Sequence, residues 1–258
     1  MRFLAFVLIV ICSSASAQVP PGAALGGYQN NVWSDYFHTF DQSGTWAQTW
    51  WISTPTLGNN HDGSVTRVPG AHIALVTNGG PYGAMIINHP DVLAAYEPSF
   101  LHGYFEASIR LATTTGAIAN NWAAFYLVSK SFLENTDIAP SGTAKRCELD
   151  IFEAHGHNTA NTTEHWWTMP PGGQWADQNN EATSLVANLP TDPLDGNYHT
   201  YGMLWKYGRV TWYYDNVQIN SFASFSGCDT TPMSIIFDVL SYGGDEQESD
   251  VAWVRVWQ

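Results

Sequence analysis

Three carboxylic acids stand close together in residues 148–153, which read ELDIFE. Side chains alternate along a β-strand, so Glu148 and Asp150 would share one face while the residue between them points into a core. Strict alternation would bury Glu153 among hydrophobic side chains, which is costly for an unpaired carboxylate. One extra residue between Asp150 and Glu153, a β-bulge, would return Glu153 to the face of the other acids. The segment therefore predicts a bulged strand with three acids on one face.

Crowded carboxylates are costly, because like charges raise the pKa of their neighbours. Glycoside hydrolysis requires such a grouping, since one carboxylate attacks the sugar and a protonated acid serves the leaving oxygen. The Cα atoms of Glu148 and Glu153 would lie roughly 13 Å apart at about 3.3 Å per residue. Side chains that lean inward can close this to the roughly 5–5.5 Å of a retaining reaction. Asp150 would lie between them, placed to hydrogen-bond the nucleophile. The alternatives are an edge strand with a solvated acidic face, or a calcium site.

The elements that must position these acids are short β-strands. Apolar and polar residues alternate in 103–111, GYFEASIRL, which indicates a strand with one wet face. Residues 210–214 and 217–219 predict a hairpin with a tight turn. Further strands are expected at 71–77, 123–129, 148–152, 164–168, 199–205, 233–240 and 251–257. About ten short strands separated by Gly, Pro and Asn predict two packed antiparallel sheets. The one helical candidate is 178–187.

The first 17 residues have the pattern of a cleavable signal peptide. Arg2 precedes a short apolar run, and small residues lead to Ala17. The run is shorter than the about 20 residues that a bilayer span needs. We therefore expect a secreted, extracellular protein: residues 1–17 as signal peptide, 18–30 as a Pro- and Gly-rich lead-in, and 31–258 as one catalytic domain.

Composition excludes several classes of function. The chain has 9 Lys and Arg against 23 Asp and Glu, a net charge of -14, and 14% aromatic residues. So few cations cannot build the basic face that nucleic acid requires, and they disfavour an anionic membrane surface. No nucleic-acid or membrane partner is expected. No metal and no cofactor is expected either, since the histidines of 155–157 lack a third ligand at a known spacing.

Two cysteines, Cys147 and Cys228, remain once Cys12 leaves with the signal peptide. In an exported protein they are compatible with one disulfide. Two buried free thiols are the alternative, because a sequence does not give the distance between the Cα atoms.

Five segments, in order along the chain, resemble the family 16 glycoside hydrolases. Residues 148–153 are similar to the longer, bulged form of the family signature, Glu-x-Asp-x-x-Glu, which is typical of laminarinase-like and agarase-like members. The other four segments are 32–37, 103–109, 121–127 and 251–257. The resemblance implies an all-β, two-sheet antiparallel β-jelly-roll sandwich of the concanavalin A-like type, with a concave cleft for a long polysaccharide. It also implies Glu148 as nucleophile, Asp150 as its assisting carboxylate and Glu153 as general acid/base.

The chain departs from the family pattern at several positions. Tyr36 stands where the family has Glu, and Ala123 stands where it has Pro. Residues 130–147 replace the usual approach to the nucleophile, and this loop would border the cleft. Ala252 takes the place of the Asp that binds a structural calcium in many members, so no such calcium is expected here.

Aromatic side chains are the expected partners of sugar rings. Trp122 lies on a strand that resembles a cleft strand of the family. Alternation sends His165 and Trp167 to one face and Trp166 to the other, and we expect the first two to face the cleft. Substrate binding is therefore assigned to Trp122, His165 and Trp167. Four other indoles are expected in the sandwich core: Trp205, Trp212, Trp253 and Trp257.

The charge balance favours a neutral substrate. Sulfated galactans call for Arg or Lys, and few are available. The sequence therefore predicts a monomeric, secreted, retaining endo-hydrolase of β-1,3-glucan or mixed β-1,3/1,4-glucan. The alternatives are endo-hydrolysis of a galactan such as agarose or carrageenan, transglycosylation to a sugar hydroxyl, and a non-catalytic β-glucan-binding lectin. A lectin has no need for the crowded acids.

Overall fold

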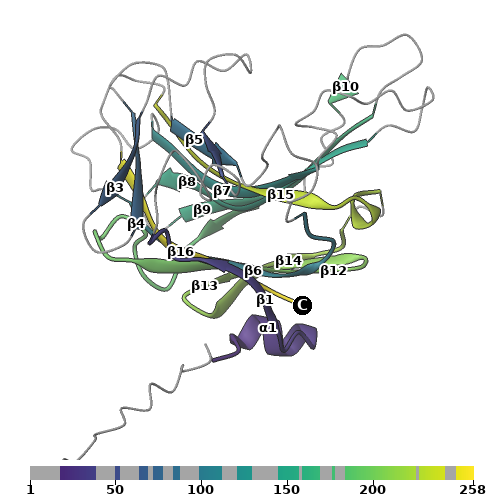
Figure 1. Cartoon of the computed structure of the whole chain (residues 1–258). Coiled ribbons are helices and arrows are strands. Elements are labelled where there is room, and N and C mark those ends of the chain that lie inside the picture. Colours follow the sequence, from purple (N-terminus) through teal and green to yellow (C-terminus); the bar gives the residue numbers. More distant parts are fainter. Residues whose placement is uncertain are drawn as a thin grey trace, which may run out of the picture.

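The structure of the protein is a computed structural model that describes residues 18–38, 50–52, 64–68, 72–77, 84–87, 99–111, 121–129, 145–156, 159–168, 176–177, 184–224, 227–241 and 248–258. The expected signal peptide and most of the loop 130–147 lie outside the described residues. Almost every described element is a strand, and the strands form two antiparallel sheets stacked face to face (Figure 1). No helix among the described residues has the length and apolar character to cross a membrane.

Sheet A is the lower sheet of Figure 1 and carries the chain termini of the domain. β1 pairs with β16, and the other strands follow one another across the sheet. In that order they are β14 (Val217–Phe222), β13 (Arg209–Tyr214), β12 (His199–Lys206), β6 (Gly103–Leu111), β16 (Glu248–Trp257), β4 (His72–Val76) and β3 (Ser64–Val68), with β1 spanning Asn31–Asp35.

Sheet B is the upper sheet and contains the acid-bearing strand, β8. β11 pairs with β9, and the other strands follow one another across the sheet. In that order they are β10 (Ala176–Asp177), β9 (Thr159–Thr168), β8 (Lys145–Gly156), β7 (Asn121–Ser129), β15 (Met233–Ser241), β5 (Ala84–Ile87) and β2 (Trp51–Ile52), with β11 spanning Ser184–Ala187.

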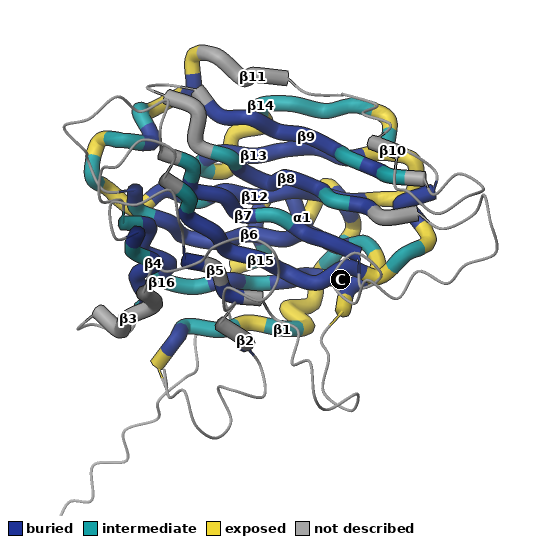
Figure 2. Tube along the Cα trace, turned by 90° about the horizontal axis from the view of Figure 1, so that it is seen from above, coloured by how far each residue is buried: buried dark blue, intermediate teal, exposed yellow. Residues whose placement is uncertain are grey.

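The core lies between the sheets, and the alternation predicted from the sequence fills it. In β6, for example, Phe105, Ala107 and Ile109 point into the main hydrophobic cluster. Buried residues run along the middle strands of both sheets (Figure 2). All ten predicted strands are present, and the β13–β14 hairpin turns at Asp215 and Asn216, both with positive φ as a tight turn requires. The jelly-roll sandwich is confirmed.

Two segments differ from the expectations. The helix expected at 178–187 is wrong at its described end, because Ser184–Ala187 forms β11 on the edge of β9. Within the lead-in, Pro21–Gly26 forms the short helix α1, which packs on the outer face of sheet A. A Cβ on Gly22 would lie 2.3 Å from the Tyr104 ring, so this close approach requires glycine.

A disulfide joins Cys147 of β8 to Cys228 of the 3-10 turn η3 (Cys228–Thr230). The two Cα atoms are 5.6 Å apart, and 81 residues separate the cysteines in sequence. The structure thus decides between the two alternatives that the sequence left open. The covalent link holds the residue directly before Glu148.

Candidate active site

The bulge predicted in the acid strand is present in β8. Asp150 pairs with Thr163 of β9 and Glu153 pairs with Asn161, so two residues of β8 oppose a single residue of β9. Both residues of the bulge are buried, and Phe152 belongs to the main core cluster. The extra residue therefore returns Glu153 to the outer face, as the cost of burying its carboxylate required.

A tryptophan from the opposite sheet holds this bulge. The indole Nε1 of Trp212 in β13 donates a buried hydrogen bond of 2.7 Å to the backbone carbonyl oxygen of Asp150. A bulge interrupts the ladder of hydrogen bonds between strands, so its carbonyl groups need other partners. Trp212 provides one of them through the core. The backbone between Glu148 and Glu153 is thus held in place from the core side of sheet B.

We call the outer face of sheet B around Glu148, Asp150 and Glu153 the acid face. In Figure 1, β10, at one end of sheet B, lies far from sheet A, whereas β5 near the other end lies beside β3 and β4 of sheet A. Asp150 is only 1% exposed, and burial, followed by repulsion from Glu153, raises its pKa well above the usual value. Burial and then Asp150 likewise raise the pKa of Glu148, against an opposing effect of His165. The acids therefore hold protons that exposed carboxyl groups would lose.

His165 and Trp167 lie on the acid face, in the orientation that alternation along β9 predicted. The Nε2 of His165 is 3.2 Å from Oδ2 of Asp150. The rings of His165 and Trp167 are stacked with centroids 5.8 Å apart, whereas Trp166 is buried in the core. Their contact with a substrate remains a prediction.

Trp122 makes a contact that the sequence did not indicate. Its indole Nε1 donates a hydrogen bond of 2.6 Å to Oε1 of Glu153. A strong hydrogen bond to one carboxyl oxygen fixes the orientation of the whole group. Trp122 can therefore position Glu153 as well as offer a ring to a sugar.

Sequence reasoning missed two residues of this site, Tyr126 and Asp238. Tyr126 of β7 lies opposite Asp150. Burial raises its pKa well above the usual value, and the charges of the surrounding carboxyl groups add to this. Asp238 of β15 pairs with Ala124, which in turn pairs with Glu153. Burial above all raises the pKa of Asp238 to about 8. Alternation along the two predicted strands was the signal that could have placed both residues on the acid face.

Glu148, Asp150 and His165 could also hold a cation. Each offers one ligand atom, and these atoms lie within 4.8 Å of one another. A carboxylate pair with one imidazole suits a divalent transition metal. A metal there would occupy the carboxylate that a glycosidase uses as its nucleophile, so the two uses of these residues exclude each other.

Comparisons with known proteins show the family to which the chain is similar. The family model described as Glycosyl hydrolases family 16 matches residues 93–255. The chain is 26% identical over 160 residues to Endo-1,3-1,4-beta-glycanase EglC of Rhizobium meliloti, a match that covers 60% of this chain and 28% of that protein. It is 25% identical over 130 residues to Beta-porphyranase B of Phocaeicola plebeius, a match that covers 44% and 39%. The chain thus spans well under half the length of these curated relatives.

Solved structures share the fold. A GH16 protein of a Bacteroides ovatus mixed linkage glucan PUL, in complex with a G4G4G3G product, has a TM-score of 0.63, 21% identity and coverage of 87% of this chain and 99% of its own. The kappa-carrageenase of Pseudoalteromonas carrageenovora has a TM-score of 0.62, 18% identity and coverage of 87% and 92%. The laminarinase catalytic domain of Thermotoga maritima has a TM-score of 0.59, 17% identity and coverage of 90% and 98%.

Proposed function

The chain belongs to glycosyl hydrolase family 16, and from this premise we propose that it is a retaining endo-β-glucanase that cleaves β-1,3-glucan or mixed β-1,3/1,4-glucan. The observation that carries the proposal is the bulge in β8. It brings Glu148 and Glu153 to one face with Asp150 between them, which is the grouping that double displacement requires.

The two outer acids divide the chemistry. The carboxylate of Glu148 attacks the anomeric carbon while Glu153 gives its proton to the leaving glycosidic oxygen. A covalent glycosyl-enzyme forms, and Glu153, now a carboxylate, removes a proton from the water that hydrolyses it. Trp122 holds Oε1 of Glu153 at 2.6 Å through both steps. Two successive inversions retain the configuration of the anomeric carbon.

Asp150 and His165 support the nucleophile. Burial raises the pKa values of both Glu148 and Asp150, so the pair retains a proton. We place that proton on Asp150, which leaves Glu148 a carboxylate and lets Asp150 donate a hydrogen bond to it. That bond stabilises the nucleophile before attack and weakens as its charge passes to the ester. His165, 3.2 Å from Asp150, orients this acid from the β9 side.

The distribution of cations supports a neutral substrate. Nine Lys and Arg residues occur in the chain, and the structure describes the side chains of four. All four belong to strands or turns of sheet A: Arg110, Lys206, Arg209 and Arg255. Among the described side chains, the acid face therefore offers carboxyl groups, rings and hydroxyl groups to a sugar, but no guanidinium or ammonium group for a sulfate.

A galactan is the second candidate. Beta-porphyranase B and the kappa-carrageenase resemble this chain about as closely as the glucanases do. Both classes of substrate are long polymers that contain β-linkages, so the acids would act in the same way on either. Contacts along the polymer would decide between them.

The test is the release of reducing ends from a panel of laminarin, lichenan, agarose, porphyran and carrageenan. We expect cleavage of laminarin or lichenan, with a β-configured first product in proton NMR. If a galactan is cleaved and neither glucan is, the proposed substrate is wrong. A product with inverted configuration would overturn the mechanism. Binding of glucan without cleavage of any polymer would favour a lectin. If the protein is given a short oligosaccharide, products longer than that oligosaccharide would indicate transglycosylation.

Export is part of the same proposal. Cleavage after Ala17 would make Gln18 the first residue of a secreted monomer, and N-terminal sequencing of protein from the medium, with sedimentation of the same sample, checks both points.

A further inference from the structure

A cavity of about 350 Å³ opens on the outer face of sheet A. Sheet A separates this cavity from the core, and sheet B carries the acid face on the far side, so the two lie on opposite faces of the sandwich (Figure 1). One wall is the chain segment 18–21, which leads into α1. The rest is formed by five side chains of sheet A and its turns: Glu106, Thr200, Asn216, Trp253 and Arg255.

Trp253 is the aromatic wall of this cavity, although the sequence predicted it in the sandwich core. That prediction is wrong, because the register of β16 against β6 shifts between Val251 and Trp253. Val251 and Val254 fill the core on either side of the irregularity, and the indole is left half-buried on the outer face. Trp257, also predicted in the core, is buried instead beneath α1. Trp253 is thus a large ring that the core does not use.

The two charged side chains of the cavity, Arg255 and Glu106, are paired with each other. The guanidinium carbon of Arg255 lies 4.0 Å from the centroid of the Trp253 ring, and its Nη1 is 3.7 Å from Oε1 of Glu106. Its Nε also donates to the hydroxyl of Tyr36 at 3.2 Å. The carboxyl group of Glu106 accepts a further hydrogen bond from the indole of Trp257 at 3.3 Å. An anion would have to displace Glu106 from Arg255, and a cation would have to displace Arg255, so an uncharged ligand costs least.

The remaining lining is amphipathic. Gln18, Thr200 and Asn216 offer amide and hydroxyl groups, while Val19 and Pro20 offer apolar contact beside the indole. A few convergent polar groups around an apolar floor are typical of a small-ligand site. A pyranose matches this lining, because its hydroxyl groups surround a ring with apolar C–H faces.

We propose that this cavity is a second binding site for a neutral glycan, and that it holds hexose units of the polymer whose cleavage we assign to the acid face. The proposal rests on the proposed function for the identity of the sugar. The two sheets are about 10 Å apart, with their outer faces pointing in opposite directions. A long polymer, or two chains of one particle, can therefore engage both sites, whereas a short oligosaccharide occupies one at a time. Linked sites of this kind raise the apparent affinity for the polymer alone.

The experiment measures binding in the Glu148→Gln background, in which polymer is not consumed. Trp253→Ala is compared with Trp253→Phe, which keeps a ring, and with Tyr207→Ala, which removes a ring that is 72% exposed in the β12–β13 turn. Affinity for the cleaved polymer should fall about tenfold or more in Trp253→Ala and much less in the other two. With Glu148 restored, kcat/KM on a short oligosaccharide should stay unchanged in all three.

Each outcome separates this proposal from the proposed function. If a glucan is cleaved and Trp253→Ala binds it as tightly as the control does, the second site is absent while the hydrolase stands. If Trp253→Ala weakens oligosaccharide cleavage as much as polymer binding, the effect comes through the fold and the proposal is wrong. If no polymer is cleaved but Trp253→Ala alone loses polymer binding, the second site stands and the hydrolase does not.

Discussion

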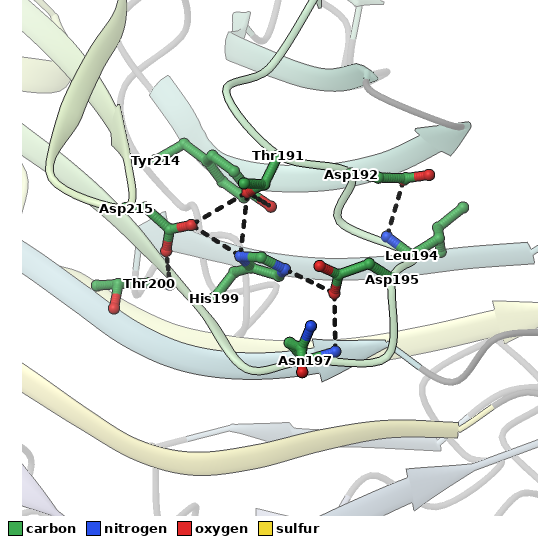
Figure 3. Close-up of polar contacts among 9 residues, drawn as sticks. All are labelled: Thr191, Asp192, Leu194, Asp195, Asn197, His199, Thr200, Tyr214 and Asp215. Atoms are coloured by element: carbon green, nitrogen blue, oxygen red, sulfur yellow. Dashed lines mark hydrogen bonds and ion pairs between the residues drawn. The ribbon is translucent and has the colours of Figure 1, made fainter.

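Two clusters of carboxyl groups and histidine lie in this molecule, and they differ in how the charges are compensated. On the acid face, three carboxyl groups and Asp238 face one another with His165 at the margin. Where β12 begins, the buried His199 lies between two carboxylates (Figure 3). Its Nδ1 is 2.7 Å from Oδ2 of Asp215, and its Nε2 is 3.0 Å from Oδ1 of Asp195.

Hydrogen-bond donors account for the difference between the two clusters. Asp195 accepts hydrogen bonds from Asn197, including its backbone N–H at 2.8 Å, and from His199, which together lower its pKa to about 2. Asp215 accepts the backbone N–H of Thr200 at 2.8 Å. Burial would lower the pKa of His199, but its hydrogen bonds to both aspartates outweigh burial and raise it. Every charge in this cluster has an opposite partner, so the cluster stabilises the fold.

The acid face has too few donors for its carboxyl groups, and it holds protons instead. Burial and mutual repulsion raise the pKa values of Glu148, Asp150 and Asp238. The same residue types therefore serve stability at one site and, in the function we propose, proton transfer at the other. Substitutions that separate activity from stability test this contrast.

The largest expected effect is that of Glu148→Gln. The amide has the same shape but cannot form the glycosyl-enzyme, so hydrolysis should fall about 10⁴-fold or more. Stability should not fall, because the change replaces a buried carboxylate with a neutral amide of the same shape. Reducing-end assays and thermal unfolding of the two proteins check both statements. A variant with more than a few per cent of the original rate would exclude Glu148 as the nucleophile.

Next comes a matched pair, His199→Ala and His165→Ala. The first leaves two carboxylates without their buried partner and should lower the free energy of unfolding by about 2–3 kcal/mol, with kcat/KM unchanged. The second should lower kcat about tenfold or more, because it removes the partner of Asp150, and should change stability by less than about 1 kcal/mol. Urea unfolding and steady-state kinetics on both variants supply the comparison.

The pH dependence of the stability of His199→Ala provides a control. Because the pKa of His199 is raised in the folded protein, its contribution to stability is full below the unfolded value of about 6.5. It is lost as the pH rises through the folded pKa. The deficit of His199→Ala should therefore shrink as unfolding is measured from pH 6 to more alkaline pH. A deficit that grows instead would contradict the charge pairing.

The smallest effect on activity is expected for Asp238→Asn, whose effect is on stability. The folded protein holds the proton of Asp238 up to a pKa of about 8, above its ordinary 3.8, so stability is full at acid pH and falls as the pH rises through this range. Asparagine has no proton to lose. At pH 8 the variant should exceed the unaltered protein in free energy of unfolding by several kcal/mol, because each unit of pKa shift corresponds to about 1.4 kcal/mol, and by less at pH 5. A difference that does not vary with pH would show that Asp238 is solvated.

The local alternation of polar and apolar residues accounts for the features that the sequence could predict. The strands, the hairpin at Asp215 and Asn216, and the bulge before Glu153 all follow from where polar side chains can be placed without burial. The jelly-roll arrangement of these strands was implied by the resemblance to a family, and the match of the family model to residues 93–255 confirms that resemblance. Contacts between distant strands were beyond such reasoning. Asp238 joins the acid face only because β15 lies beside β7.

Elements held by tertiary contacts were also missed. α1 has six residues, too few to be stable alone, and forms because Ala23 packs on a second cluster that includes Tyr104 and Trp257. The misplacement of Trp253 has a similar cause, since an irregularity in β16 reverses the alternation that had assigned it to the core. A single residue of register changes the face on which a side chain lies.

Because Trp212 donates a hydrogen bond to the bulge, packing in the hydrophobic core affects the geometry of the acid face. The backbone between Glu148 and Glu153, the two acids of the proposed reaction, is held by a hydrogen bond of 2.7 Å from an indole of the other sheet to the carbonyl oxygen of Asp150. A change in core packing around Trp212 would therefore move the bulge that carries the acids. We expect it to change turnover before it changes the melting temperature. Engineering for heat resistance in this sandwich should leave that one tryptophan in place.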